Sequence, residues 1–133
     1  MESIFTRIIN RELPAYIVDE TKDFISILAR EQIQPGHVLV IPKKPADKYT
    51  DMNTEDYLEL QSYALRIAKI LKKSYSNKQR IVLNIVGFEI AHLHIHLIPA
   101  NNMEEVNKQG VVLTEEEMIQ IQSTILEHNI QLL

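Results

Sequence analysis

The amino-acid sequence predicts an α+β fold, with an antiparallel sheet of about five strands, one long helix, and terminal helices packed against the sheet. Several short runs rich in apolar and β-branched residues follow one another through short connections, which favours antiparallel pairing. One long central segment repeats its apolar residues at helical spacing. A length of 133 residues with 45% apolar content fits one domain over residues 1–133.

The N-terminal half of the chain begins with a short predicted helix over residues 3–10, which we expect Pro14 to end. The predicted strands before the long helix comprise residues 15–20, 24–29 and 37–42. Residues 21–23 are polar and lie between the first two strands, so they are expected to form a hairpin turn. Pro42 stops the third strand, which is a nearly continuous apolar run.

The long helix is predicted to begin at Asn53 or Thr54, because either side chain can cap it and two acidic residues follow in its first turn. Its apolar stripe is Tyr57, Leu60, Ala64, Ile67 and Leu71. The basic residues toward its far end are typical of a solvated face near a helix C-terminus.

The C-terminal half contains a strand over residues 81–86, an apolar run with alternating histidines over residues 92–99, and a polar loop over residues 101–110. A final helix is predicted to start at Thr114, with Glu117 completing a capping box. Its expected buried stripe is Met118, Ile121 and Ile125.

Composition narrows the classes of function. A net charge of −4 argues against a general affinity for nucleic acid. The chain has no cysteine, which excludes disulfides, thiol catalysis and thiolate metal sites. No apolar stretch approaches the ~20 residues of a transmembrane helix, and the first residues lack the pattern of a secretory signal. We therefore expect a soluble cytoplasmic protein that binds neither nucleic acid nor a membrane.

The most informative feature is the alternation of His92, His94 and His96 with apolar residues. Side chains of a strand point to opposite faces in turn, so the three imidazoles should line one face at a spacing of roughly 6–7 Å. Such a row can grip an anion, hold a metal, attack an electrophile, or simply pack in the core. Core packing requires a separate set of hydrogen-bond partners for each ring.

The metal and nucleophile hypotheses make different demands. Catalytic zinc uses three protein ligands and an open position, usually with carboxylates behind the ligands, and the nearby acid is Glu89. A neutral imidazole attacks phosphorus when one ring nitrogen is free and an acceptor holds the proton on the other. A flanking histidine, as the cation, can then neutralise phosphate oxygens or protonate the leaving group.

Three segments resemble the histidine triad (HIT) family. Residues 92–98 match its His-φ-His-φ-His-φ-φ signature, in which φ is an apolar residue. Residues 35–44 are similar to its Gly-His-x-Leu-Val-Ile-Pro-Lys stretch, and residues 4–15 are similar to its Ile-Phe-x-Lys-Ile-Ile-x-x-Glu-Ile-Pro-Ala opening. The segments occur in the family order and imply a HIT-like α+β meander.

The resemblance implies a nucleotide hydrolase or nucleotidyl transferase that cleaves at the α-phosphate of nucleoside phosphoramidates or dinucleotides, without a cofactor. His94 would attack phosphorus and form a covalent nucleotidyl-histidine. His92 would orient His94 through its backbone carbonyl. His96 would contact the phosphate and the leaving group, and His37 would support the triad from the neighbouring strand.

The same matching implies a set of substrate contacts and an assembly. The residues expected to face the nucleobase are Ile4, Phe5, Ile8 and Leu28, although ordinary core packing explains them equally well. Asn84 is expected to reach the phosphate. Glu89 lies just before the triad, where it would either repel a phosphate or hydrogen-bond a histidine ring. Members are usually homodimers that pair the long helix and an edge strand across a two-fold axis.

The sequence departs from the family pattern at several positions. Ser3 and Thr6 stand where many members carry zinc-binding cysteines, so we expect no metal. Ala29 stands where many members have an aspartate that binds the ribose hydroxyls, and Phe88 and Glu89 replace polar residues of the loop before the triad. These departures motivate an alternative function, in which a HIT domain binds purine nucleotides with little or no turnover.

Overall fold

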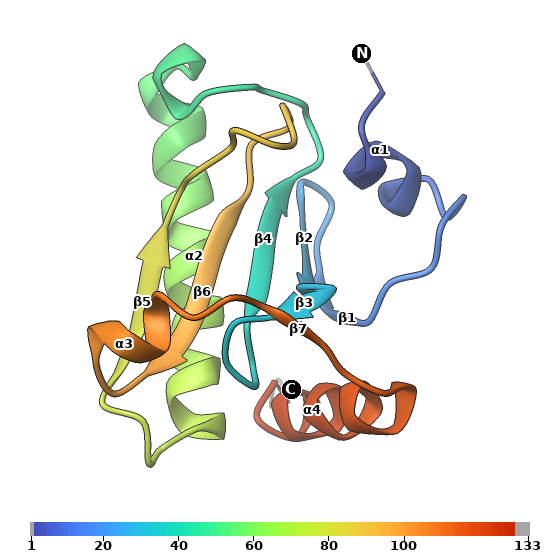
Figure 1. Ribbon diagram of the computed structural model, residues 1–133. Coiled ribbons are helices and arrows are strands. Elements are labelled where there is room, and N and C mark those ends of the chain that lie inside the picture. The colour runs from blue at the N-terminus through green and yellow to red at the C-terminus, as the bar shows by residue number, and fades with distance from the viewer. Residues whose placement is uncertain (1, 130–133) are drawn as a thin grey trace.

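The computed structural model describes residues 2–129 (Figure 1). The helices are α1 (Ile4–Ile9), the short 3-10 helix η1 (Tyr49–Asp51), α2 (Thr54–Ser74), α3 (Met103–Val106) and α4 (Glu115–Glu127). The strands are β1 (Ile17–Glu20), β2 (Phe24–Leu28), β3 (Glu31–Gln32), β4 (Val38–Pro42), β5 (Arg80–Asn84), β6 (Ile95–Ala100) and β7 (Val111–Val112).

Five strands form one antiparallel sheet in the order β1-β2-β4-β6-β5. Helices α2 and α4 pack on one face of this sheet, and α1 packs on the other (Figure 1). Strands β3 and β7 form a separate two-stranded ribbon. The predicted α+β class, five-stranded sheet, long helix and terminal helices are therefore confirmed. β6 lies between β4 and β5, so the segment that carries the histidines enters the interior of the sheet.

The two long helices follow the predicted local signals. Asn53 caps α2 by accepting a hydrogen bond of 2.8 Å from the Asp56 N–H. The buried face of α2 is Leu60, Tyr63, Ala64, Ile67 and Leu71, whereas the predicted Tyr57 is only half-buried. Thr114 and Glu117 form the predicted capping box of α4. Its buried stripe is Met118, Ile121 and Ile125, as predicted.

The predicted histidine strand is longer than the observed one. Pairing between β4 and β6 begins only at Ile95, because the Leu93 N–H donates to the Ala46 carbonyl at 2.6 Å instead of to β4. Side-chain alternation nevertheless persists through this irregular segment. Leu93 and Ile95 belong to the core cluster beneath α2 and α4, whereas His94 contacts the α1 side of the sheet. His92 and His94 thus precede β6, and His96 is its second residue.

Three short elements differ from the predictions. α1 ends at Ile9, within one residue of the predicted end, but Pro14 does not end it, because the chain already turns at Arg11, which adopts a left-handed conformation with φ of 63°. The predicted polar loop over residues 101–110 contains α3, capped by Asn102. The ribbon of β3 and β7 was not predicted, since two-residue strands carry no periodicity.

Candidate active site

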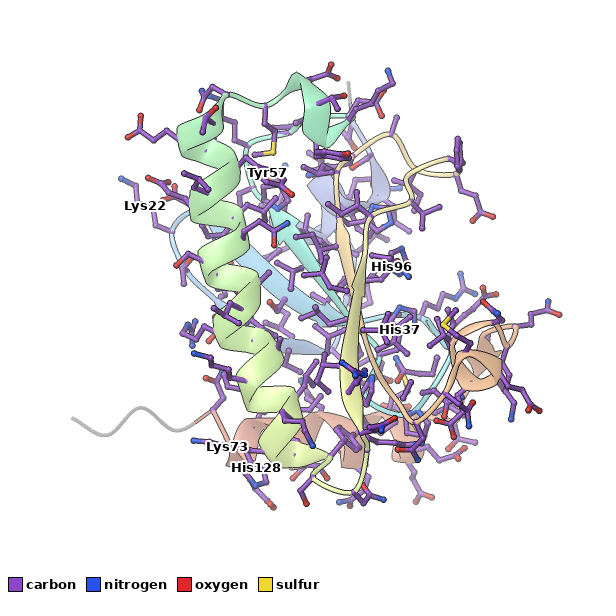
Figure 2. All side chains as sticks on the ribbon, turned by 90° about the vertical axis from the view of Figure 1, so that its left-hand side faces the viewer. Lys22, His37, Tyr57, Lys73, His96 and His128 are labelled. Carbon is purple, nitrogen blue, oxygen red and sulfur yellow. The ribbon has the colours of Figure 1, made fainter. Side chains whose placement is uncertain are left out.

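The candidate site lies on the sheet face that carries α1. Figure 2 shows His37 and His96 close together on the side of the sheet facing away from α2. Their ring centroids are 5.2 Å apart, and the His94 and His96 centroids are 4.9 Å apart. The rings therefore lie closer together than the spacing of an ideal strand predicts, since the backbone is irregular before Ile95.

One hydrogen bond of the His94 ring fixes where its proton resides. His94 Nδ1 lies 2.8 Å from the His92 carbonyl oxygen, which can only accept, so Nδ1 carries the proton. His94 Nε2 makes no hydrogen bond within residues 2–129 and keeps its lone pair. Burial lowers the pKa of His94 below its usual value, which keeps the ring neutral. The ring is therefore a preformed nucleophile with one free nitrogen.

His92 is held at both ring nitrogens and is 2% exposed. Its Nε2 lies 2.9 Å from the Pro42 carbonyl oxygen, so Nε2 donates there. Its Nδ1 then accepts from the Ser3 hydroxyl at 2.8 Å. Because both nitrogens are engaged, the side chain of His92 orients the backbone that supports His94 instead of meeting a ligand.

The third ring of the triad is linked to His37. The Ile33 N–H donates to His37 Nδ1 at 3.2 Å, which places the His37 proton on Nε2. That proton is donated to His96 Nδ1 at 3.0 Å. His96 must then carry its own proton on Nε2, the nitrogen that faces away from His37. His94 and His96 consequently present a lone pair and an N–H side by side.

The structure changes one feature of the predicted chemistry. Burial, with His94 nearby, lowers the pKa of His96 to about 4. Burial and the neighbouring His96 lower the pKa of His37 to about 3, and the Glu31 carbonyl, which favours the charged ring, offsets this only in part. His96 is therefore neutral near pH 7 before substrate binds, rather than the cation expected from the sequence. It donates through a neutral N–H.

The apolar residues predicted to face the base divide into two groups. Phe5 and Ile8 are buried on the histidine side, and the Phe5 ring meets the His94 ring edge-on at 4.9 Å. Ile4 is 45% exposed at the start of α1. Leu28 requires a correction, because it belongs to the core cluster beneath α2 and α4. Its neighbour Ile27 lies on the histidine side instead, since side chains of β2 alternate between faces.

The two polar substrate candidates are placed differently. Asn84 lies directly opposite His96 in the register of β5 and β6. Its Oδ1 is buried without a hydrogen-bond partner among residues 2–129, which is costly unless a ligand completes it. Glu89 is exposed in the loop before the triad, next to Phe88, which is 95% exposed. Ile90 of the same loop packs against the apolar cluster on the histidine side, so the loop borders the site while Phe88 and Glu89 are exposed.

Within residues 2–129, no group of three or more His, Asp or Glu side chains is arranged to hold a metal ion. Ser3 hydrogen-bonds His92 as described above, and Thr6 completes the capping box of α1. Among the same residues, none of the helices is both long enough and apolar enough to cross a membrane.

Comparison with known proteins decides the family. The family model of the HIT domain matches residues 10–103. The chain belongs to the HIT family. An uncharacterized HIT-like protein of Methanocaldococcus jannaschii is 33% identical over 113 residues, covering 82% of this chain and 88% of that protein. The adenosine 5'-monophosphoramidase HNT1 of Saccharomyces cerevisiae is 32% identical over 110 residues, covering 83% of this chain and 67% of the yeast protein.

Solved structures of HIT proteins share the fold. A hypothetical histidine triad nucleotide-binding protein from Sulfolobus tokodaii superposes with a TM-score of 0.80 at 31% identity, covering 93% of this chain and 89% of that one. The resemblance identified from the histidine motif and the two supporting segments is therefore confirmed.

Several residues of the site were missed or misjudged from the sequence. Ser3 was noted only as a position without cysteine, yet its hydroxyl holds His92. The Ile33 amide and the Gln32 side chain, which organise His37, give no sequence signal because neither belongs to a motif. Leu28 was chosen instead of Ile27. Because side chains of a strand alternate between faces, this error of one residue selects the opposite face of the sheet.

Proposed function

We propose that this HIT protein is a nucleotide hydrolase or nucleotidyl transferase that cleaves at the α-phosphate of nucleoside phosphoramidates or dinucleotides through covalent His94. The observation that carries this proposal is the opposite protonation of two adjacent rings. His94 offers a lone pair on Nε2, and His96 offers an N–H on Nε2. A nucleophile and a proton donor side by side suit displacement at phosphorus.

In the proposed first step, one of the two rings supplies the nucleophile and the other supplies the proton. The lone pair of His94 Nε2 forms a bond to the α-phosphorus while the bond from phosphorus to the leaving nitrogen or oxygen breaks. His96 Nε2–H supplies the proton that the leaving group needs, and general acid help of this kind contributes about 10²–10⁴-fold. The His92 carbonyl, 2.8 Å from His94 Nδ1, stabilises the positive charge that develops on the ring.

The proposed second step returns the enzyme to its starting state. Water or another acceptor attacks phosphorus and breaks the bond to His94 Nε2, which releases the nucleotide. The acceptor's proton passes to His96 Nε2, whose lone pair was freed in the first step. Because both rings have pKa values below the usual range, each regains its neutral form near pH 7.

Substrate contacts follow from the positions of the surrounding side chains. We place the base against the apolar group on the α1 side, made of Ile4, Phe5, Ile8 and Ile27. The unpaired Asn84 Oδ1 lies on the strand next to His96, so Asn84 is placed at the phosphate or at the leaving group. Glu89 is exposed and free to accept a hydrogen bond from an amino group of the leaving part. The names of the yeast monophosphoramidase and the Sulfolobus nucleotide-binding protein support a nucleotide as the substrate.

The decisive experiment traps the intermediate on His94. Wild-type protein is mixed with adenosine 5'-phosphoramidate, quenched within milliseconds under alkaline conditions, and analysed by intact-mass and peptide mass spectrometry. We expect an adenylyl group on His94 and release of AMP. His94→Asn should form no adduct and retain the fold. His128→Asn is the matched control, because His128 lies on the distant end of α4 (Figure 2) and should leave turnover unchanged.

A second candidate function is nucleotide binding with little turnover, and Ala29 favours it. Ala29 is buried on the histidine side and offers no side-chain acceptor for ribose hydroxyls. Losing such a charged acceptor weakens binding by about 1.5–3 kcal/mol. Calorimetry with AMP and GMP, combined with the trapping experiment, separates the candidates. Binding without an adduct on wild-type protein supports the second function and contradicts the first.

We also propose a homodimer that pairs α2 and the edge strand β5 across a two-fold axis. β5 ends the sheet, and Leu83 on it is 43% exposed. Leu58 and Leu65 lie two turns apart on α2 and are 60% and 54% exposed. Apolar side chains on neighbouring elements suit a shared interface. Light scattering after size-exclusion chromatography should give a dimer for wild type and a monomer for Leu65→Glu, with Leu126→Glu on α4 as the control.

A further inference from the structure

A buried glutamine organises the loop between β2 and β4. Gln32 is 3% exposed, and its carboxamide makes four hydrogen bonds. Oε1 accepts from the Gly36 N–H at 3.0 Å and from the His37 N–H at 3.1 Å. Nε2 donates to the Ala29 carbonyl at 2.7 Å and to the His37 carbonyl at 2.9 Å. Two donors and two acceptors are the full capacity of an amide, so this side chain has a single orientation.

These four bonds join the two ends of the loop. Ala29 follows β2 and His37 precedes β4, so the carboxamide bridges the strands at the point where their pairing stops. Gly36 completes the turn with φ of 94°, a conformation that favours glycine. Residues 30–36 are thereby held in one path. The next residue after Gln32 is Ile33, whose N–H donates to His37 Nδ1.

We propose that Gln32 is a positioning residue for the reaction, which fixes the path of this loop so that the Ile33 amide determines the proton positions on His37 and His96. This role of Gln32 rests on the proposed function. With the Ile33 amide on His37 Nδ1, both rings must carry their protons on Nε2. The proton of His96 then faces the leaving group. If the loop relaxes, either nitrogen of His37 can be protonated, and His96 loses its defined donor.

The structure also offers the competing proton arrangement. The Glu31 backbone carbonyl favours the charged His37 ring. A neutral His37 with its proton on Nδ1 would reverse the proton positions on both rings. The Ile33 N–H meets the geometry of a hydrogen bond to that nitrogen at 3.2 Å. The two arrangements give different tautomers, so a spectroscopic measurement distinguishes them directly.

The test combines nitrogen-15 NMR of the histidine rings with rapid-quench kinetics of adduct formation. In wild-type protein we expect His37 and His96 protonated on Nε2, and His94 protonated on Nδ1. Gln32→Leu should give averaged tautomer signals for His37 and His96 while leaving His94 unchanged. The rate of adduct formation should fall roughly tenfold to hundredfold, since a general acid supplies about 10²–10⁴-fold, and the nucleotide KM should change little.

Gln34→Leu is the matched control. Gln34 lies on the same loop and is also buried. Its side chain donates to the Glu105 carbonyl at 3.2 Å and makes no hydrogen bond to His37 among residues 2–129. Its variant should keep the wild-type tautomers and rate. If Gln32→Leu does not fold, Gln32→Glu decides by the same two readouts, because a carboxylate keeps both acceptor bonds and loses both donor bonds.

The outcomes separate this inference from the proposed function. Nδ1 protonation of His37 in wild-type protein, or unchanged tautomers and rate in the folded Gln32 variant, would overturn the positioning role. A wild-type protein that forms no adduct overturns the proposed function, and the NMR measurement still reports whether Gln32 sets the tautomers.

Discussion

Ser3 joins the N-terminal helix to the triad, and replacing it tests both roles at once. The Ser3 hydroxyl accepts from the Thr6 N–H at 3.2 Å as the cap of α1, and it lies 2.8 Å from His92 Nδ1. Loss of an N-cap costs about 1 kcal/mol. A buried polar atom left unpaired costs about 1–3 kcal/mol more. We therefore expect Ser3→Ala to lower the free energy of unfolding by about 2–4 kcal/mol.

Thr114→Ala separates the two contributions. Thr114 caps α4 in the same capping-box arrangement, accepting from the Glu117 N–H at 3.1 Å, and it is exposed. This variant should lose only the cap, about 1 kcal/mol. Urea unfolding of both variants measures the difference directly. Thermal midpoints should fall by about 3–5 °C per kcal/mol for a chain of this size.

The activity of the two variants completes the test. Ser3→Ala removes a hydrogen bond that holds the His92 ring. Because the backbone carbonyl of His92 orients His94 through Nδ1, adduct formation should slow about tenfold. Thr114→Ala should leave that rate unchanged. The reasoning is refuted if Ser3→Ala loses no more stability than Thr114→Ala, or if it forms the adduct at the wild-type rate.

Two further predictions concern stability. Burial holds the pKa values of His37 and His96 at about 3 and about 4, whereas the unfolded rings take up protons below their usual value of 6.5. The free energy of unfolding should therefore fall as pH falls from about 6.5 toward 4, and urea titrations should show a smaller fall in His37→Asn. A flat profile for wild type contradicts this. Gly36→Ala should lose about 2–4 kcal/mol, because φ is 94° and a Cβ would lie 2.5 Å from the Tyr75 ring. Gly87→Ala has a similar φ of 80° but no heavy atom within 4 Å among the described residues, so it should lose only about 1–2 kcal/mol; equal losses would show that the Tyr75 contact is unimportant.

Much of the fold was predictable because its signals are local. The capping residues Asn53 and Thr114 and the helical spacing of apolar residues predicted α2 and α4, and the apolar runs predicted the sheet. The short elements α3, β3 and β7 were not predicted, because they are too short to leave a local signal in the sequence. α3 spans four residues, and β3 and β7 span two each, so tertiary contacts rather than periodicity establish them.

The site was predictable as a set of residue types and in one contact, because the His92 carbonyl that the resemblance implied for orienting His94 lies 2.8 Å from its Nδ1. Alternation correctly placed the histidines away from the α2 core, and it also explains why choosing Leu28 instead of Ile27 selected the wrong face. Both ring partners of His92 come from distant segments. Ser3 lies 89 residues from His92, and no spacing rule links them. The sequence therefore indicated histidine chemistry but did not show which nitrogen of each ring was free.

That missing information is what makes the three histidines chemically unequal. Carbonyl oxygens and backbone amides, rather than carboxylates, direct the protons in this site. The His92 carbonyl keeps the proton of His94 on Nδ1, and the Ile33 amide, through His37, keeps that of His96 on Nε2. The His92 carbonyl raises the pKa of His94, but burial lowers it by more, so the pKa of the ring stays below its usual value. His94 therefore stays an uncharged nucleophile beside an uncharged donor.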